Sequence, residues 1–121
     1  MKIAVSATGK DLHCEIDPRF GRCQYFIFID PETMEFEVIE NEGLMASGGA
    51  GVQAAQSVVQ KGANAVITGN LGPNAASALS ASGIKVYLAP GGTVKDVIEG
   101  YKSGSLREAG GATVAPHFGK P

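Results

Sequence analysis

The hydrophobic pattern of this chain changes near residue 41, and this change constrains the fold more than any other feature. Before it, residues 25–29 (Tyr-Phe-Ile-Phe-Ile) and 34–40 have the composition of two strands, joined by a turn at Asp30–Thr33. After it, apolar residues recur at helical spacing in three stretches that alternate with short apolar segments. The sequence therefore predicts elements in the order β-ββ-α-β-α-β-α.

The expected strands lie at residues 2–6, 25–29, 34–40, 65–68 and 84–89. The expected helices run from Val52 to Gly62, from Ala75 to Gly83 and from Val94 to Gly104. A hairpin followed by strand–helix alternation implies a mixed sheet covered by helices. We predict an α/β, three-layer, ribonuclease-H-like fold with a five-stranded mixed sheet in the order 3-2-1-4-5. Only the second strand is expected to be antiparallel, with helices on both faces.

Length and charge limit the classes of protein to which the chain can belong. Its 121 residues, 44% hydrophobic and 18% charged, predict one globular domain over residues 1–105 and a flexible tail over 106–121. Ten basic and twelve acidic residues give a net charge of −2, so we expect no nucleic-acid partner. No apolar run is long enough for a membrane span or a signal peptide. We expect a cytoplasmic protein with reduced thiols.

Glycines precede each expected helix. In the predicted topology these segments lie at the carboxyl ends of the parallel strands, where open α/β sheets bind ligands. A helix start offers unpaired N–H groups and partial positive charge, to which two loop arginines would add. The alternative is that the glycines serve turns and that Ser47 and Thr93 only cap helices. The candidate anion-binding residues are Arg19, Arg22, Ser47, Gly48, Gly49, Gly51, Asn70, Gly72, Asn74, Gly91, Gly92 and Thr93.

Three candidate metal ligands, His13, Cys14 and Cys23, lie in the long loop over residues 7–23. Imidazole and thiolate suit copper, zinc and iron–sulfur species. The spacing of the two cysteines matches no standard zinc or iron–sulfur pattern, and Cys14 has the alternative of being a small buried hydrophobe. Cys23 follows Arg22, which is a setting for an activated thiol.

Common enzyme signatures are absent from the sequence. Residues 49–54 fit a loose dinucleotide pattern, but no acidic residue ends the next strand to bind a ribose. Two-metal nuclease chemistry needs carboxylates on the central strands, and residues 2–6 and 65–68 carry none. We therefore expect a protein that is not an enzyme.

Several segments together resemble the dinitrogenase iron–molybdenum cofactor biosynthesis family over residues 1 to about 105. They are Phe20–Cys23, Tyr25-Phe26, Ser47–Ala55, Gly69–Ala75 and Gly83–Tyr87. The resemblance implies the ribonuclease-H-like fold and a small carrier that binds iron–sulfur or molybdenum-containing clusters. It adds Phe20 and Gly21 to the candidate cofactor-binding residues. Arg19 stands where the family usually has histidine, so a permanent cation replaces an imidazole.

The leading hypothesis is a non-enzymatic carrier of an anionic iron–sulfur or molybdenum-containing cluster, working as a monomer or weak dimer between cluster donor and acceptor proteins. The alternative is a regulatory or binding module for a small phosphorylated or carboxylate ligand, which would use the same helix starts without a metal.

Overall fold

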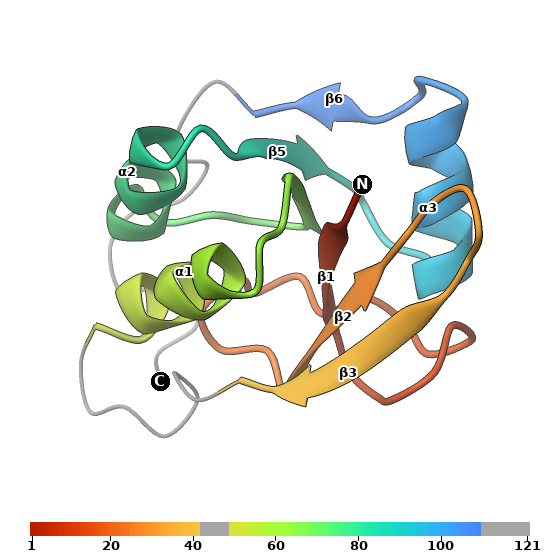
Figure 1. The fold of residues 1–121 in the computed structure, drawn as a ribbon, viewed down its shortest axis with the longest axis horizontal. Coiled ribbons are helices and arrows are strands. Elements are labelled where there is room, and N and C mark those ends of the chain that lie inside the picture. The colour runs from red at the N-terminus through yellow and green to blue at the C-terminus, as the bar shows by residue number, and fades with distance from the viewer. Residues whose placement is uncertain (42–48, 110–121) are drawn as a thin grey trace.

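The computed structural model describes residues 1–41 and 49–109 of the chain as a mixed sheet with helices on both faces (Figure 1). The strands are β1 (Ile3–Ala7), β2 (Tyr25–Ile29), β3 (Phe36–Glu40), β4 (Ala65–Thr68), β5 (Lys85–Leu88) and β6 (Arg107–Glu108). The helices are α1 (Ala50–Gln60), α2 (Pro73–Ala81) and α3 (Val94–Lys102). The strand order is β3-β2-β1-β4-β5-β6, which confirms the predicted 3-2-1-4-5 arrangement.

Strand direction follows from the pairing. β2 is antiparallel to both β1 and β3, and β4 and β5 are parallel to the central strand β1. The carboxyl ends of β1, β3, β4 and β5 therefore lie at the same end of the sheet. The segments that lead into α2 and α3 start at these carboxyl ends, and so does Asn41, which follows β3.

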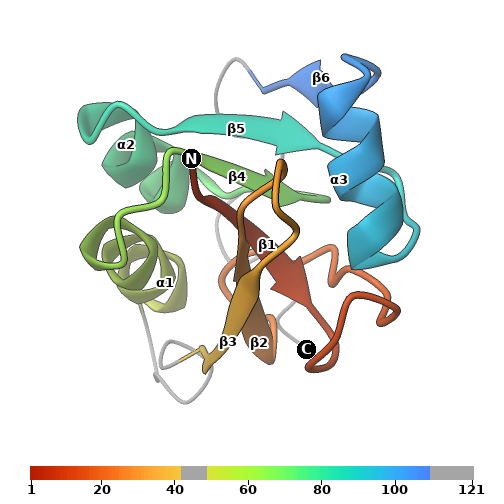
Figure 2. The same ribbon diagram turned by 45° about the vertical axis from the view of Figure 1, so that its right-hand side comes forward.

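The sheet separates two hydrophobic cores, as Figure 2 shows with α3 on one side and α1 and α2 on the other. Alternation along β2 explains this division. Phe26 and Phe28 point into the core beneath α1 and α2, while Ile27 and Ile29 point into the core beneath α3. A run of five apolar residues is therefore buried on both of its faces, as expected for an internal strand.

The sixth strand was not predicted. Arg107 and Glu108 pair antiparallel with Leu88 and Tyr87, so the sheet has six strands and β2 is not its only antiparallel member. These two residues fall within the range expected to be a tail. They pair because β5 otherwise has an open edge beside them. Residues 110–121, the remainder of the expected tail, lie outside the described part.

Candidate functional site

The long loop between β1 and β2 is fixed to the carboxyl ends of the central strands by buried hydrogen bonds. The Ser6 hydroxyl, at the end of β1, lies 2.6 Å from the Asp17 carbonyl oxygen and 2.8 Å from the Thr68 hydroxyl. The Asn70 N–H donates to the Pro18 carbonyl at 2.7 Å. Residues 17–19 therefore lie against the end of β4.

The Asp17 side chain, which is 8% exposed, orients the next residues of the loop. Its Oδ1 accepts hydrogen bonds from the backbone N–H of Arg19 at 2.9 Å and from Arg19 Nε at 3.5 Å. The Arg19 side chain is 43% exposed. It is thus a cation tied at one end to the loop and open to solvent at the other.

Small residues bring the loop and two helix starts together. A Cβ atom on Gly21 would lie 3.0 Å from the amide nitrogen of Gly51, in the first turn of α1. A Cβ on Gly51 would lie 3.4 Å from the Cβ of Ala75, in the first turn of α2. The loop, the start of α1 and the start of α2 consequently meet at one place.

These two helix starts lack caps. Gly49 precedes α1 with a φ of 71°, and Gly72 precedes α2; neither helix has a side-chain cap or an acidic residue in its first turn. Across residues 1–41 and 49–109, no acceptor is present for four first-turn N–H groups. They belong to Gly51, Val52, Asn74 and Ala75. Two adjacent helix N-termini therefore present free donors and partial positive charge.

The start of α3 differs, and the expectation that Gly91, Gly92 and Thr93 bind an anion is not supported. The N–H groups of Val94 and Lys95 donate to the carbonyls of Cys14 and Leu12, each at 2.9 Å. A capping box closes the turn, because the Thr93 hydroxyl accepts from the Asp96 N–H and the Asp96 carboxylate accepts from the Thr93 N–H, both at 3.1 Å. These donors are already used within the fold.

The predicted thiol ligand Cys23 is not accessible. It is 0% exposed and its Sγ lies 3.3 Å from the Phe20 carbonyl oxygen. Burial, together with the nearby Asp17 carboxylate, raises the pKa of the Cys23 thiol far above its ordinary value of about 9. An activated thiol has a lowered pKa, so burial gives Cys23 the opposite of the activation expected from the sequence.

His13 and Cys14 lie apart from Cys23. The Cys14 backbone binds the start of α3, whereas Cys23 belongs to the core beneath α1 and α2 on the opposite face of the sheet. His13 is exposed, and Cys14 is half-buried with its Sγ 3.6 Å from Asp11 Oδ1. Within residues 1–41 and 49–109, no group of three or more His, Cys, Asp or Glu side chains could hold a metal ion.

The other predicted residues have different roles. Phe20 is 2% exposed and packs against Phe26, with ring centroids 5.2 Å apart, so it supports the loop from below. Arg22 is half-buried and makes a further interaction within the protein. Asn70 is half-buried and Asn74 exposed, both beside the start of α2. Ser47 and Gly48 lie outside the described residues.

The sequence reasoning missed two residues that contact the loop between β1 and β2 at the carboxyl ends of the strands. The Asn41 amide, directly after β3, donates to the carbonyls of Gly21 at 3.1 Å and Cys23 at 2.9 Å. An asparagine at the end of a strand is a recognisable turn residue, but its partner 18 positions away is not readable from spacing. Lys10 Nζ lies 5.4 Å above the Tyr25 ring and adds positive charge to the loop.

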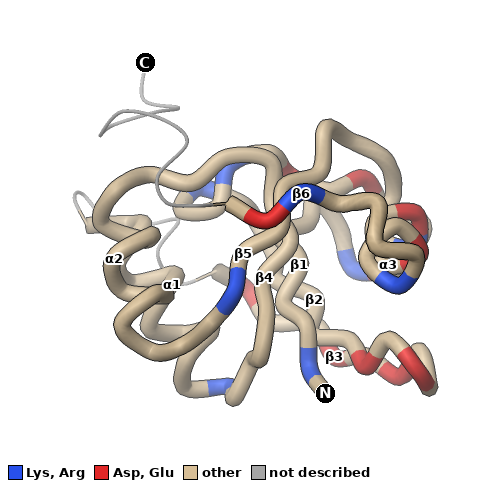
Figure 3. The backbone as a smooth tube through the Cα atoms, turned by 90° about the horizontal axis from the view of Figure 1, so that it is seen from above, with Lys and Arg blue, Asp and Glu red and all other residues tan. Residues whose placement is uncertain are grey.

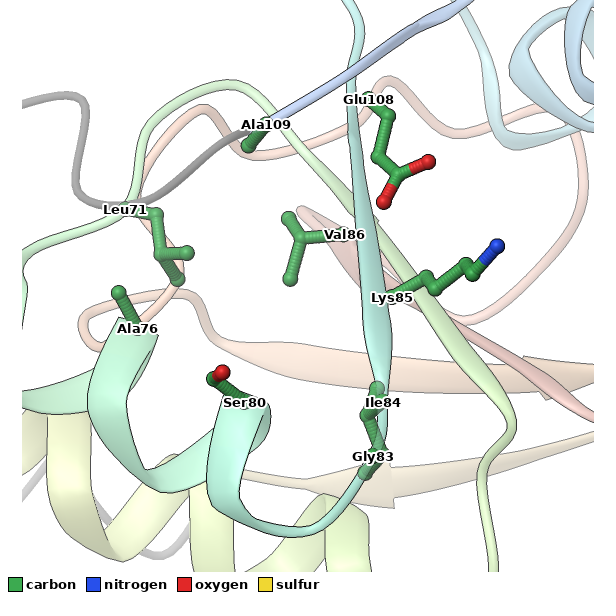
Figure 4. A pocket seen from close by; sticks show the side chains of 9 residues that line it. All are labelled: Leu71, Ala76, Ser80, Gly83, Ile84, Lys85, Val86, Glu108 and Ala109. Atoms are coloured by element: carbon green, nitrogen blue, oxygen red, sulfur yellow. The ribbon is translucent and has the colours of Figure 1, made fainter.

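A separate hollow of about 380 Å³ lies between α2 and the β5–β6 edge (Figure 4). Leu71, Ala76 and Val86 point toward its interior, whereas Lys85 and Glu108 point away on the other side of β5. A ligand site combines an apolar lining with a few convergent polar groups. The polar groups that line this hollow do not converge in it. The stronger candidate is the place where the loop at Gly21 meets the starts of α1 and α2, because unbonded N–H groups gather there.

Comparisons with known proteins agree with this fold. An uncharacterized protein of Methanocaldococcus jannaschii is 33% identical over 111 residues, covering 89% of this chain and 91% of the relative. The apo form of the orange protein from Desulfovibrio gigas superposes with a TM-score of 0.89 and 39% identity, covering 93% of this chain and 96% of that one. A NifB-like Thermotoga protein of the DUF35 family has a TM-score of 0.78 and 40% identity, with 88% and 91% covered.

A family model described as dinitrogenase iron-molybdenum cofactor matches residues 1–104. The match extends from β1 through α3 and includes the loop and both uncapped helix starts. Among residues 1–41 and 49–109, no helix has the length and apolarity needed to cross a bilayer. The chain belongs to the dinitrogenase iron-molybdenum cofactor family.

Proposed function

We propose that this protein is a non-enzymatic carrier that binds an anionic iron–sulfur or molybdenum-containing cluster during cofactor biosynthesis or delivery. The single observation that carries the proposal is the pair of uncapped helix starts, where Gly51 lies against Ala75 beside the loop that holds Arg19. Free N–H groups and the positive ends of two helices stabilise a bound anion without requiring many lysines. Membership of a cofactor family supports the identity of the cargo.

The mode of binding follows from where the cysteines lie. Cys23 is buried, which raises the pKa of its thiol, and the Cys14 backbone binds the start of α3, away from the starts of α1 and α2. We propose that the cluster keeps its own sulfur ligands and is held from outside by backbone N–H groups and the Arg19 guanidinium. Hydrogen bonds from charged or amide donors to sulfur-rich anions need no exchange of metal ligands, which suits a protein that must later release its cargo.

The role as a carrier implies transient partners that donate and accept the cluster. We place the protein in the cytoplasm, which the two free thiols at Cys14 and Cys23 support, because reduced cysteines are the rule there. A monomer or weak dimer is sufficient, since the loop and both helix starts come from one chain.

A second candidate function is a binding module for a small phosphorylated or carboxylate ligand. The same uncapped helix starts favour it, because free N–H groups bind oxyanions as readily as sulfide-bearing anions. The burial of Cys23 and the position of Cys14 beside the start of α3 favour it equally, because this module needs no thiol.

The test is a substitution that places a negative charge at the start of α2. Gly72 has open space around its Cβ position and an extended backbone with φ −80° and ψ 169°, so Gly72→Asp fits without strain. The new carboxylate would cap α2 and occupy the N–H groups of Asn74 and Ala75. It is expected to stabilise the fold by about 0.5 kcal/mol while repelling an anion. Gly91→Asp adds the same charge where space is also open, before α3.

The protein is reconstituted without oxygen using iron, molybdate and sulfide, and bound metal and cluster absorption are measured. The carrier proposal expects loading in the wild type, in Gly91→Asp and in a variant lacking both cysteines, but not in Gly72→Asp. A colourless, metal-free wild type that is stabilised against heat by inorganic phosphate or simple carboxylates would instead establish the second candidate. Equal loading of Gly72→Asp and Gly91→Asp would contradict both.

A further inference from the structure

The two edges of the sheet differ in how well they are protected. β6 forms one edge with only two residues, Arg107 and Glu108. β3 forms the other edge with five residues, Phe36–Glu40, and among the residues the structure describes no strand lies beyond it. Short edge strands resist pairing with other chains, whereas a five-residue edge offers a complete template.

The hydrogen bonds of the hairpin show which backbone groups of β3 face outward. The Asp30 N–H donates to the Glu35 carbonyl at 2.9 Å, and the Asn41 N–H donates to the Gln24 carbonyl at 3.1 Å. Antiparallel pairs alternate between hydrogen-bonded and non-hydrogen-bonded positions. The backbone N–H and C=O groups of every second residue of β3 therefore point away from β2. These outward-facing residues are Phe36, Val38 and Glu40.

An apolar surface accompanies these free backbone groups. Phe36 is 42% exposed, which makes it one of the few large hydrophobic side chains open to solvent in the described part of the chain. Val38 lies two positions further along the strand, on the same face, and is half-buried. An incoming strand could therefore gain hydrogen bonds and cover Phe36 at the same time.

The charge around this edge is of one sign. Residues 30–40 contain five acidic side chains and no lysine or arginine. Figure 3 shows acidic positions gathered along β3 and the turn that precedes it. The described ion pair in this region joins Glu37 to Lys61 at 3.9 Å, between two largely exposed side chains, and it neutralises one carboxylate of the five.

The negative charge along β3 favours one kind of incoming strand over another. Pairing with a second copy of β3 would bring two acidic strands together, which is destabilising because like charges face one another across the pair. A segment with lysine or arginine at alternate positions would meet the carboxylates and place apolar residues against Phe36. We propose that the outer edge of β3 is a docking strand for an extended basic segment of another protein, bound by strand addition.

The proposal is independent of the cargo, so it is tested on the full chain without any cluster. The probe is a short, end-blocked peptide in which lysine and valine alternate, and the matched control peptide has glutamate in place of lysine. Amide NMR shifts and hydrogen exchange of the isotope-labelled protein report the binding site. Slowed exchange at Phe36, Val38 and Glu40 with the lysine peptide alone is the expected result.

Two pairs of variants separate backbone pairing from general attraction. Val38→Pro removes an outward-facing N–H that β2 does not use, so affinity should fall at least about tenfold while thermal unfolding stays cooperative. Should that variant not fold, N-methylation of alternate amides in the peptide must produce the same loss. Glu35→Gln, which removes a carboxylate on the face opposite Phe36, should weaken binding and its salt dependence. Glu99→Gln, which removes the same charge on α3, should not.

Several outcomes would overturn the proposal. One is the absence of saturable binding by the lysine peptide, which would mean that the carboxylates only keep this edge from aggregating. Another is equal binding after Val38→Pro or amide N-methylation. A third is concentration-dependent self-association that protects the same three amides, because the occupant would then be a second copy of this chain.

Discussion

Gly21 and Gly51 touch through their backbones, and a side chain on Gly21 would collide with the first turn of α1 at 3.0 Å. Because Gly51 in turn lies against Ala75 of α2, the candidate site depends on a row of residues that have little or no side chain. The same contact explains how the loop between β1 and β2 reaches two helix starts at once. The glycines that allow the loop to pack against α1 therefore lie beside the unbonded N–H groups of the two helix starts.

The first prediction concerns this contact. Gly21→Ala should lower the free energy of unfolding by about 1–3 kcal/mol, because the new Cβ meets backbone atoms that cannot move aside easily. Urea denaturation measures the change. Gly91→Ala is the matched control, since its Cβ position is open, and it should be neutral or stabilising by about 0.4–1 kcal/mol. Equal effects of the two substitutions would contradict the proposed packing.

The second prediction follows from the buried thiol. Burial raises the pKa of Cys23 in the folded protein, whereas the unfolded chain loses that proton near pH 9. The native state therefore holds more protons than the unfolded state above pH 9. Its free energy of unfolding should fall by up to about 1.4 kcal/mol per pH unit between pH 9 and 10, and Cys23→Ala should remove this fall.

Urea denaturation of the wild type and of Cys23→Ala at several pH values isolates this contribution, because other groups titrate alike in both proteins. Thiol labelling gives an independent check. Cys14 should react in the folded protein, and Cys23 should react only when the chain unfolds. Identical pH profiles for the two proteins would show that Cys23 is not held as a neutral thiol.

The third prediction separates the closed start of α3 from the open starts of α1 and α2. Thr93→Ala removes a cap and should lower the free energy of unfolding by about 1 kcal/mol, as followed by thermal unfolding. Cluster loading should remain unchanged, because the N–H groups of Val94 and Lys95 are bound by loop carbonyls. A loss of loading as large as that of Gly72→Asp would return the start of α3 to the candidate site.

Hydrogen bonds from Thr93 hold the pKa of the Asp96 carboxyl below its ordinary value. Its stabilising effect is therefore present above the pKa of the unfolded carboxyl and is lost as the pH falls through the lower, folded pKa. The acid side of the stability profile should change in Asp96→Asn. Because the shift lowers the pKa, the free energy of unfolding of the wild type should fall more than that of Asp96→Asn as the pH decreases. Urea denaturation at several acidic pH values measures the difference.

The sequence predicted the fold well because its determinants are local. The alternation of Phe26 and Ile27 and the turn at Pro31 define the hairpin without knowledge of the rest of the chain. The pair Arg107–Glu108 could not be predicted as a strand, because two residues carry no measurable period. Its structure depends on the open edge of β5, which only the assembled sheet provides.

The candidate site was predicted less well because its state depends on contacts between distant segments. Glycine-rich helix starts are visible in the sequence, but whether their N–H groups are free is not. The carbonyl of Cys14 closes α3 from 80 positions away. Cys23 lies just before β2, where strand alternation no longer tells which way a side chain points. Its burial therefore required the folded structure.

The last prediction assigns the positive side-chain charge of the candidate site to Arg19. Asp17 accepts hydrogen bonds from both the backbone N–H and the Nε of this residue, whose side chain is 43% exposed. Arg19→Gln should reduce cluster loading several-fold and flatten its dependence on sodium chloride, because exposed charges act through screened attraction. Arg19→Lys should keep the salt dependence while losing part of the loading, since lysine lacks the forked donor geometry. Arg107→Gln, which removes an exposed arginine from β6, is the control and should load as the wild type does. If Arg19→Gln and Arg107→Gln behave alike, the two helix starts bind the anion without help from the loop.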